Sequence, residues 1–290
     1  MKILITGSRG QLGADCLSVL GGSAGVDLPE FDITDRLRCL RELDDRQPDV
    51  IVNCAAYTEV DACETNPVCR RVNADGAKVL AEWAAANGAF LVQVSTDYVF
   101  DGTRPLFDAY TEDDIPAPLS EYGRSKLEGE RFVLDSGAQA AVLRTAWLYG
   151  VSGKNFLKTM LWRALQSPEQ EIRVVNDQFG SPTWSYTLAR QIAAVIETRA
   201  TGVFHATSEG YCSWFELASR FLSLMDVPHR IAPCTTADYP TAARRPKNSI
   251  LENRALKKAG INLFGGWESE LEGFVSNCGA QLVDGVPLST

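Results

Sequence analysis

The chain has 290 residues, of which 45% are hydrophobic and 22% charged, so it can bury a sizeable core in one large or two unequal domains. Its formal net charge of −9 and its pI near 4.9 argue against a nucleic acid or an anionic membrane surface as a partner, because either would require a basic face. No apolar run approaches the roughly 18 residues that span a bilayer, and the first residues become glycine-rich too soon for a secretory signal, so we expect a cytoplasmic protein.

A glycine-rich turn follows the first predicted strand. Residues 2–6 form a short apolar run typical of a buried parallel strand, and a helical pattern covers residues 12–20. Gly7, Gly10 and Gly13 lie at this junction. Such glycines permit a tight turn and a close approach of the backbone to a pyrophosphate, while the first N–H groups of the helix face the phosphates. The pattern predicts a dinucleotide-binding site.

The end of the second predicted strand bears on the choice of cofactor. This strand ends at Val26 and Asp27, and an acid in that position usually binds ribose hydroxyls, whereas a 2′-phosphate needs a nearby arginine. Leu28 follows Asp27, which favours NADH, although Arg9 in the glycine turn could still meet the phosphate of NADPH.

Helical and strand patterns then alternate up to residue 145. Helices are predicted over 37–43, 72–88 and 122–134, and strands over 49–56, 90–94 and 141–145. This alternation predicts an α/β fold with a Rossmann-type, doubly wound parallel sheet that binds its ligands at the carboxyl ends of the strands.

The regular alternation fades beyond Gly150. The patterns there predict helices over 156–165, 185–198, 213–225, 253–259 and 267–278, strands over 172–175 and 203–206, and no element from residue 279 onward. We therefore expect a nucleotide-binding domain over 1–150 and a smaller, mixed α/β substrate-binding part over 151–290. Segments around 184–207 are expected to return to the first sheet.

Three side chains near the central strand could transfer a proton. Thr96 follows that strand, and Tyr122 and Lys126 lie four residues apart on a predicted helix, so they share a face. A phenol, with an ordinary pKa near ~10, transfers protons poorly at neutral pH unless a neighbouring cation stabilises its phenolate. Together these groups could give or take one proton at a C–O bond.

The cysteines and histidines suggest no further chemistry. The eight cysteines form no Cys-x-x-Cys pair, and His205 and His229 are the only histidines, so no zinc-binding spacing exists. We expect most of the cysteines to be inert, small hydrophobic residues and predict no metal site.

Longer strings of residues extend these motifs. They occupy positions 32–35, 52–61, 72–73, 95–102, 122–126, 144–150, 177–183 and 244–249. The glycine turn with Tyr122-x-x-x-Lys126 is typical of the short-chain dehydrogenase/reductase superfamily. The strings resemble its extended, nucleotide-sugar branch, and within that branch the dTDP-4-dehydrorhamnose reductase family. The resemblance covers residues 1 to about 270.

The resemblance implies that NADPH or NADH reduces the C4 keto group of dTDP-4-dehydro-β-L-rhamnose to give dTDP-β-L-rhamnose, the last step of activated rhamnose synthesis. Tyr122 would protonate the C4 alkoxide, Lys126 would lower the pKa of the phenol and hold the nicotinamide ribose, and Thr96 would bind the carbonyl.

Further positions match contacts of that family. Those of the cofactor are Gly7, Gly10, Gln11, Leu12, Gly13, Asp32, Ile33, Ala55, Ala56, Tyr57, Thr58, Tyr122 and Lys126. Those of the substrate are Thr96, Asp97 and Trp147. Arg245, from the pair Arg244 and Arg245, is expected at the substrate diphosphate, because an acidic enzyme needs local cations there.

Three departures from the family pattern limit these expectations. Cys54 stands where the family usually has alanine, and Leu28 where many relatives have arginine. Asp15 replaces a glutamate that bridges magnesium between subunits in some members, so a monomer or a homodimer is expected without a metal.

Other functions stay open. They are reduction of another nucleotide-4-keto-6-deoxysugar, epimerisation, and a regulatory role on the same scaffold, as in the β-subunit of methionine adenosyltransferase. The complete set of Thr96, Tyr122 and Lys126 favours an enzyme.

Overall fold

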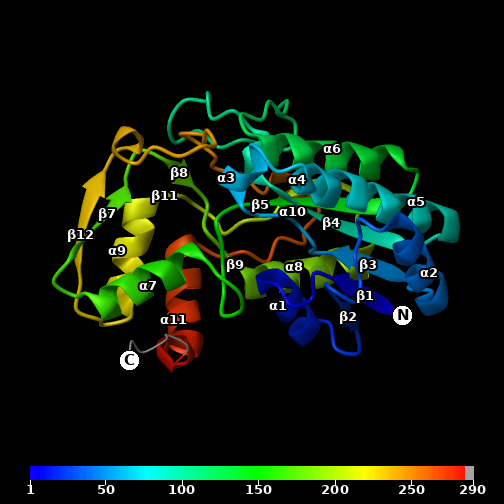
Figure 1. Ribbon diagram of the computed structural model, residues 1–290, viewed down its shortest axis with the longest axis horizontal. Helices are drawn as coiled ribbons and strands as arrows, with labels where there is room; N and C mark the ends of the chain where they lie inside the picture. Colours follow the sequence, from blue (N-terminus) through cyan, green and yellow to red (C-terminus); the bar gives the residue numbers. More distant parts are fainter. Residues whose placement is uncertain (285–290) are drawn as a thin grey trace.

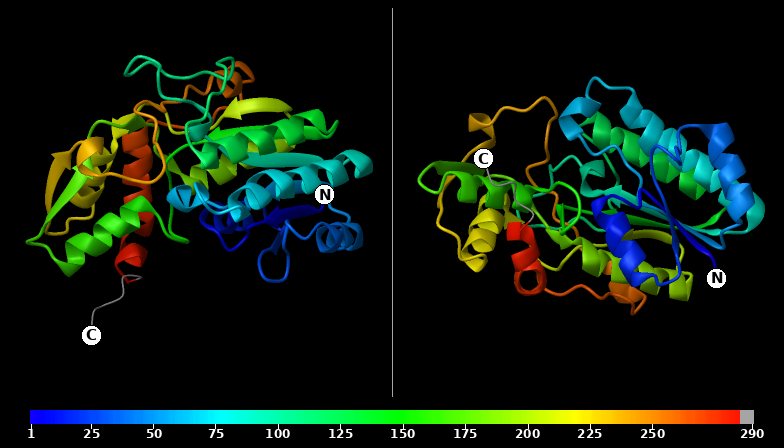
Figure 2. Two further views of the ribbon diagram at one scale, coloured as in Figure 1. Left: turned by 45° about the horizontal axis from the view of Figure 1, so that its top comes forward. Right: turned by 60° about the horizontal axis from the view of Figure 1, so that its bottom comes forward.

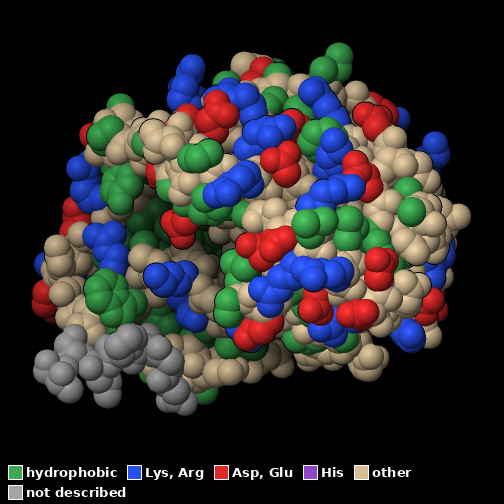
Figure 3. All heavy atoms as spheres, turned by 45° about the vertical axis from the view of Figure 1, so that its right-hand side comes forward, with side chains coloured by type: hydrophobic (Ala, Val, Ile, Leu, Met, Phe, Trp, Pro, Cys, Tyr) green, Lys and Arg blue, Asp and Glu red, His purple; other side chains and the backbone are tan. Residues whose placement is uncertain are grey.

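The computed structural model describes residues 1–284, so the last six residues of the expected second domain lie outside the described part. It has two lobes, a larger one around a central sheet and a smaller one at the left of Figure 1. Among the described helices, none has the length and hydropathy of a segment that crosses a bilayer. Basic and acidic side chains are intermingled on the face shown in Figure 3.

The central sheet has six strands, all parallel, in the order β10-β5-β4-β3-β1-β2. The strands are β1 (Ile3–Thr6), β2 (Ala24–Val26), β3 (Val50–Asn53), β4 (Phe90–Thr96), β5 (Gln139–Thr145) and β10 (Gly202–His205). After β2 the chain returns to the other side of β1 to form β3, and this change of direction opens a crevice at the carboxyl ends of β1 and β3. The predicted doubly wound sheet is confirmed.

Helices cover both faces of this sheet (Figure 2). One face carries α1 (Gln11–Val19) and α8 (Ser185–Thr198), and the other carries α2 (Arg36–Arg46), α5 (Ala77–Asn87) and α6 (Glu121–Asp135). Successive side chains of a strand point to opposite faces, so Ile5 packs in the core under α1 and α8 while Leu4 packs in the core under α2 and α5.

The smaller lobe has its own hydrophobic core, which includes Leu161, Phe221 and Phe274. Its helices are α7 (Phe156–Gln166), α9 (Trp214–Leu224) and α11 (Trp267–Asp284), and its strands are the parallel pair β7 (Glu171–Val175) and β12 (Arg230–Cys234). Two short ladders lie near the junction of the lobes: the parallel pair β6 (Leu148–Tyr149) and β9 (Thr183–Trp184), and the antiparallel pair β8 (Phe179–Gly180) and β11 (Cys212–Ser213).

The remaining elements are short. They are α3 (Val60–Cys63), α4 (Val68–Arg70), the π-helical turn η1 (Arg71–Gly76), η2 (Asp97–Val99), η3 (Thr236–Asp238) and α10 (Arg254–Lys258). We propose the division into 1–150 and 151–290 as the domain boundary, with α8 and β10 assigned to the first lobe because they cover and extend its sheet.

Three expectations need correction. β12 was not predicted, because only Cys234 of its five residues is buried and Pro233 interrupts the strand pattern. The expectation of no helix or strand from residue 279 onward was wrong for residues 279–284, where α11 continues. Cys63 and Cys69, expected to be inert, form a disulfide.

A buried ion pair fixes α6 to the sheet. Arg144 on β5 donates from Nη2 to Glu130 Oε2 of α6 at 2.7 Å and from Nε to Oε1 at 3.0 Å. Ser95 on β4 donates to the same carboxylate at 2.5 Å. Glu130 is 1% exposed and Arg144 is 4% exposed, so water stabilises neither charge and each needs the other as its counter-charge.

Glu130→Gln should lower the free energy of unfolding by about 3–5 kcal/mol, because it leaves the Arg144 guanidinium buried without a counter-charge. Denaturant-induced unfolding measures the change. Asp113→Asn is the control: it breaks the exposed Arg254–Asp113 pair, which should cost about 1 kcal/mol or less. An equal loss of unfolding free energy in the two variants would contradict the claim that burial makes the Glu130–Arg144 pair more important for stability.

Candidate active site

A cavity of about 630 Å³ opens at the carboxyl ends of the central strands, between the two lobes. Parallel sheets bind ligands at this edge. The predicted site residues that line it are Gly10, Gln11, Leu12, Ala56, Thr58, Thr96, Asp97, Tyr122, Lys126 and Trp147. The structure therefore brings together the three candidate catalytic residues and parts of both predicted binding sites.

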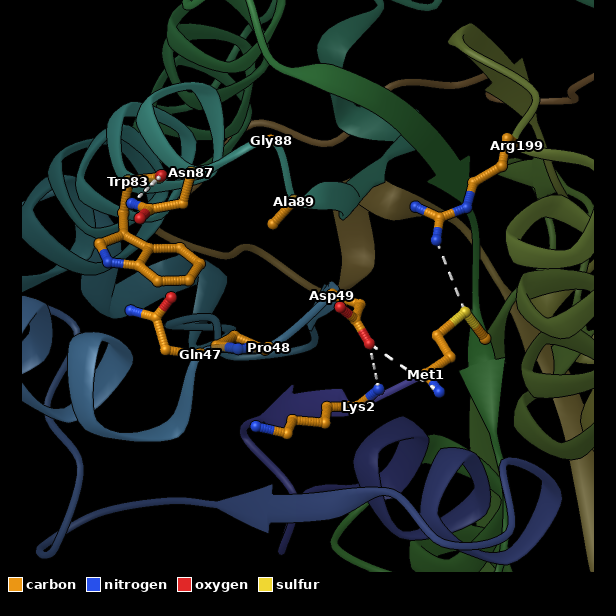
Figure 4. Close-up of a pocket in the computed structure, with 10 residues that line it drawn as sticks. All are labelled: Met1, Lys2, Gln47, Pro48, Asp49, Trp83, Asn87, Gly88, Ala89 and Arg199. Atoms are coloured by element: carbon orange, nitrogen blue, oxygen red, sulfur yellow. Dashed lines mark hydrogen bonds and ion pairs between the residues drawn. The ribbon is translucent and has the colours of Figure 1, made fainter.

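A second hollow, of about 510 Å³, lies at the opposite edge of the sheet (Figure 4). Two of its charged side chains already have partners in the chain: Asp49 accepts from the backbone N–H of Lys2 at 2.6 Å, and Arg199 contacts the sulfur of Met1. None of the predicted site residues lines it.

The glycine turn leaves room for an anionic group at the start of α1. Gly7 has φ +64°, and a Cβ there would lie 2.7 Å from Ala55 Cα, so a larger residue would displace the neighbouring loop. A Cβ on Gly10, the N-cap of α1, would lie 3.1 Å from Gly7 O. No side chain caps the helix, so its first N–H groups are available to a pyrophosphate. The turn fits a dinucleotide.

The other predicted cofactor residues lie outside the cavity lining and make contacts within the protein. The backbone N–H of Tyr57 donates to Asn73 Oδ1 at 2.9 Å, and Tyr57 O accepts from Asn73 Nδ2 at 3.1 Å. Asp32 accepts from the backbone N–H of Thr34 at 2.8 Å, and Ile33 is 5% exposed. Gly7, Gly13, Asp32, Ile33, Ala55 and Tyr57 are not part of the cavity lining, and their contact with a cofactor stays a prediction.

Tyr122 lies in the first turn of α6. Ser120 caps this helix by accepting from the backbone N–H of Gly123 at 3.2 Å. Burial raises the pKa of Tyr122 to about 12, a hydrogen bond with Thr96 opposes the shift, and the nearby Asp97 carboxylate adds to it. The phenol is therefore protonated at neutral pH and next to the hydroxyl expected to bind the same substrate atom.

Lys126, one turn further along α6, is 4% exposed. Its ammonium donates to Val94 O at 2.6 Å. Burial lowers the pKa of Lys126 to about 8, while the Glu130 carboxylate opposes that shift. The expected lowering of the Tyr122 pKa by Lys126 stays a prediction, because the ammonium here bonds to the sheet backbone.

Asp97 places a carboxylate in the cavity wall. It is 2% exposed, and its Oδ1 accepts from Thr96 Oγ1 at 3.0 Å. Its Oδ2 makes no hydrogen bond of good geometry among the described residues, although the Ser249 hydroxyl lies close to the carboxylate. Burial raises the pKa of Asp97 to about 6, and the hydroxyls of Ser249 and Thr96 oppose the shift. Because Asp97 lines the cavity, its carboxylate could accept from a ligand hydroxyl.

Trp147 forms an aromatic wall with Trp214. Their rings stack with centroids 3.6 Å apart and an interplanar angle of 9°. Trp147 has φ +47°, a left-handed conformation that is rare for a bulky residue and that turns the chain after β5. Gly180 makes room for the ring, because a Cβ there would lie 2.5 Å from Trp147 Cε2.

Arg245 lies outside the main cavity. Its guanidinium pairs with Asp61 at 2.7 Å and lines a neighbouring hollow of about 310 Å³. Arg163 and Arg173 line the same hollow, which shares Phe156 and Trp214 with the main cavity. Arg245 therefore lies where an elongated ligand could extend beyond the main cavity.

Sequence reasoning predicted that the second part of the chain binds the substrate, but it missed three residues by which that part lines the main cavity. Asn155, Phe156 and Trp214 line the main cavity. Asn155 Nδ2 donates to Gln11 Oε1 at 2.7 Å, which joins the second lobe to the glycine turn. The one local signal is that Asn155 precedes a helical pattern and caps α7.

Comparisons with known proteins agree with this geometry. The family model described as the RmlD substrate binding domain matches residues 1–279. A dTDP-4-dehydrorhamnose reductase from Burkholderia thailandensis is 41% identical over 285 residues, covering 91% of this chain and 94% of the relative. A dTDP-4-keto-6-deoxy-D-glucose reductase from Streptomyces niveus is 38% identical over 277 residues, covering 92% and 94%.

A solved structure agrees in fold as well. The crystal structure of a dTDP-4-dehydrorhamnose reductase from Bacillus anthracis, in complex with NADP, is 37% identical, with a TM-score of 0.91 over 95% of this chain and 99% of that one. Because the family model spans nearly the whole chain and these relatives match it along most of their length, the chain belongs to the dTDP-4-dehydrorhamnose reductase (RmlD) family.

Proposed function

We propose that this protein reduces the C4 keto group of dTDP-4-dehydro-β-L-rhamnose to give dTDP-β-L-rhamnose, the last step of dTDP-rhamnose biosynthesis, with NADPH or NADH as reductant. One observation carries the proposal: Thr96, Tyr122 and Lys126 share a cavity with the first turn of a helix suited to a pyrophosphate. The family membership supports it.

The reduced nicotinamide would supply the hydride, and the protein would supply the proton. Thr96 holds the C4 oxygen next to the phenol, and Tyr122 donates its proton as negative charge develops on that oxygen. The phenolate that remains needs a positive charge nearby, because burial disfavours it. Lys126 provides this charge and binds the nicotinamide ribose.

Further contacts would orient the nucleotide sugar. The carboxylate of Asp97 accepts from a sugar hydroxyl, and Trp147 offers its ring to the pyranose. Arg245 and the two other arginines of the neighbouring hollow attract the diphosphate. These roles place the sugar in the main cavity and the nucleotide toward the second lobe.

The surroundings of β2 suit either nicotinamide cofactor. Asp27 Oδ2 accepts from the backbone N–H of Arg9 at 2.7 Å, so the carboxylate lies beside the glycine turn, where ribose hydroxyls bind. The Arg9 side chain is 64% exposed and pairs with Glu30. It could leave Glu30 and bind the 2′-phosphate of NADPH instead. NADPH use is supported by the NADP bound in the Bacillus anthracis relative.

A second substrate has its own support. The Streptomyces niveus relative is named for the reduction of dTDP-4-keto-6-deoxy-D-glucose. The catalytic residues serve either keto sugar, because both reductions deliver a hydride and a proton at C4. We further propose a cytoplasmic location, and a monomer or a homodimer as the active form.

The direct test is oxidation of NADPH and NADH by the purified protein, with dTDP-4-dehydro-L-rhamnose generated in place from dTDP-glucose by the upstream dehydratase and epimerase. We expect turnover to dTDP-rhamnose, and the two rates rank the cofactors. Turnover that does not need the epimerase, with a product other than dTDP-rhamnose, would identify dTDP-4-keto-6-deoxy-D-glucose as the substrate instead.

Tyr122→Phe should reduce kcat by roughly a hundredfold or more while leaving NADPH affinity nearly unchanged, because proton transfer typically contributes ~10²–10⁴. Lys126→Ala, by contrast, should reduce both kcat and cofactor affinity. Steady-state kinetics and NADPH fluorescence titration separate the two effects. A Tyr122→Phe variant with most of its activity would identify another proton donor.

The pH dependence of kcat/KM should be bell-shaped. Asp97 must be ionised to accept from the sugar, so activity should fall below its pKa of about 6. Lys126 must be charged, so activity should fall above its pKa of about 8. Asp97→Asn should lower kcat/KM and flatten the acid limb alone. An unchanged acid limb in that variant would assign the limb to another group.

A further inference from the structure

The Cys63–Cys69 disulfide lies behind the active site. It joins α3 to α4, and the two residues are 4% and 2% exposed. Both short helices pack against α6, as Figure 1 shows. The covalent link therefore lies against the helix that carries Tyr122 and Lys126.

One sulfur of the disulfide touches the catalytic helix directly. Cys69 Sγ lies 3.4 Å from Ser125 Oγ, and Ser125 lies between Tyr122 and Lys126 in the sequence. The Ser125 hydroxyl also bonds to Tyr122 O at 2.8 Å. Asn73 Nδ2 reaches both the same hydroxyl, at 3.1 Å, and Cys69 Sγ, at 3.5 Å. Movement of Cys69 would disturb this cluster.

The disulfide closes the segment 63–69, and two side chains of this segment bind other parts of the site. Glu64 Oε1 accepts from the backbone N–H of Glu121, the first residue of α6, at 2.9 Å. Asn66 Nδ2 donates to the hydroxyl of Tyr57 at 3.1 Å. Tyr57 belongs to the segment 55–58, which is expected to contact the cofactor, and Ala56 and Thr58 line the cavity. The closed segment thus supports α6 and the cofactor loop together.

We propose that the Cys63–Cys69 disulfide is a redox-sensitive site that controls cofactor binding: when a dithiol reduces it, the segment loosens and NAD(P)H binds more weakly. The proposal rests on the proposed function in taking a nicotinamide nucleotide as the cofactor and the cytoplasm as the location. A disulfide in a cytoplasmic protein more often serves redox sensing or catalysis than structure.

The redox step is thiol–disulfide exchange with a small dithiol. One thiolate of the dithiol attacks a sulfur of the disulfide and expels the other cysteine as a thiolate. The second thiol of the dithiol then displaces the first cysteine. The protein disulfide gains two electrons and two protons to become two thiols, and the dithiol becomes a disulfide.

Thermodynamic linkage makes the coupling reciprocal. If the disulfide raises the affinity for NADPH by some factor, bound NADPH must favour the disulfide over the dithiol state by the same factor. A cross-link without an effect on the cofactor site would show neither change.

The first experiment measures the Kd of NADPH by fluorescence for the air-oxidised and the dithiothreitol-reduced protein, with the redox state confirmed by intact mass. We expect reduction to raise the Kd about fivefold or more, in the usual range for coupled sites. The Cys63→Ala/Cys69→Ala variant should have the Kd of the reduced protein, and dithiothreitol should not change that Kd. Cys212→Ala/Cys234→Ala, which removes two buried free thiols from the second lobe, should keep the full response.

The second experiment titrates the native protein with mixtures of reduced and oxidised dithiothreitol, with and without saturating NADPH. The ratio needed for half-reduction should rise with NADPH by the factor found for the Kd. This measurement needs no variant, so it stands even if the double variant fails to fold.

Equal Kd values for the two redox states, an unchanged half-reduction ratio, or no disulfide in the air-oxidised protein would each overturn the proposal. Neither experiment uses a keto sugar. Redox-dependent binding without turnover would therefore refute only the proposed substrate, and turnover with redox-independent binding would refute only the redox site.

Discussion

The attachment of α6 to the sheet is the constraint on which the site depends. Tyr122 and Lys126 both lie on this helix, so any shift of it along β4 and β5 would move the proposed proton donor and the cation together. The buried Glu130–Arg144 pair holds the helix laterally, and the bond from Lys126 to Val94 O holds it one turn closer to the cavity. A buried ion pair adds little net stability compared with apolar packing, but it admits only one arrangement of its partners. Here that arrangement fixes the positions of the proposed catalytic residues Tyr122 and Lys126.

Burial also sets the protonation states of the titratable groups that line the cavity. It favours the neutral forms of Tyr122, Lys126 and Asp97, which raises the pKa values of the two acids and lowers that of the amine. The phenol therefore stays protonated at neutral pH, while the pKa values of the carboxylate and the ammonium lie close to neutral pH. The same desolvation that makes these groups costly to bury suits them to act on a ligand that excludes water.

The sequence was most informative where chemistry requires certain residues at fixed local spacing. The glycine turn, Thr96, and the Tyr122 and Lys126 pair could all be recognised, because each is set by its strand or helix. Contacts between distant positions could not. Arg245 pairs with Asp61, 184 positions away, and Asn155 binds Gln11 across 144 positions. The stacking of Trp147 on Trp214 depends on how the two lobes meet. The disulfide was missed because spacing alone does not show that two Cα atoms approach to 5.3 Å.

The return of the chain to the first sheet means that the two lobes are not separable pieces of sequence. β10 covers the outer side of β5, and α8 fills the core over one face of the sheet with Leu188, Ile192 and Val195. A fragment that ended at residue 150 would expose β5 as an open edge strand beside an uncovered apolar face. Such an edge pairs readily with other chains, so the fragment would tend to aggregate. The larger lobe can therefore reach its final form only after residue 205 has been synthesised, when much of the smaller lobe has already left the ribosome.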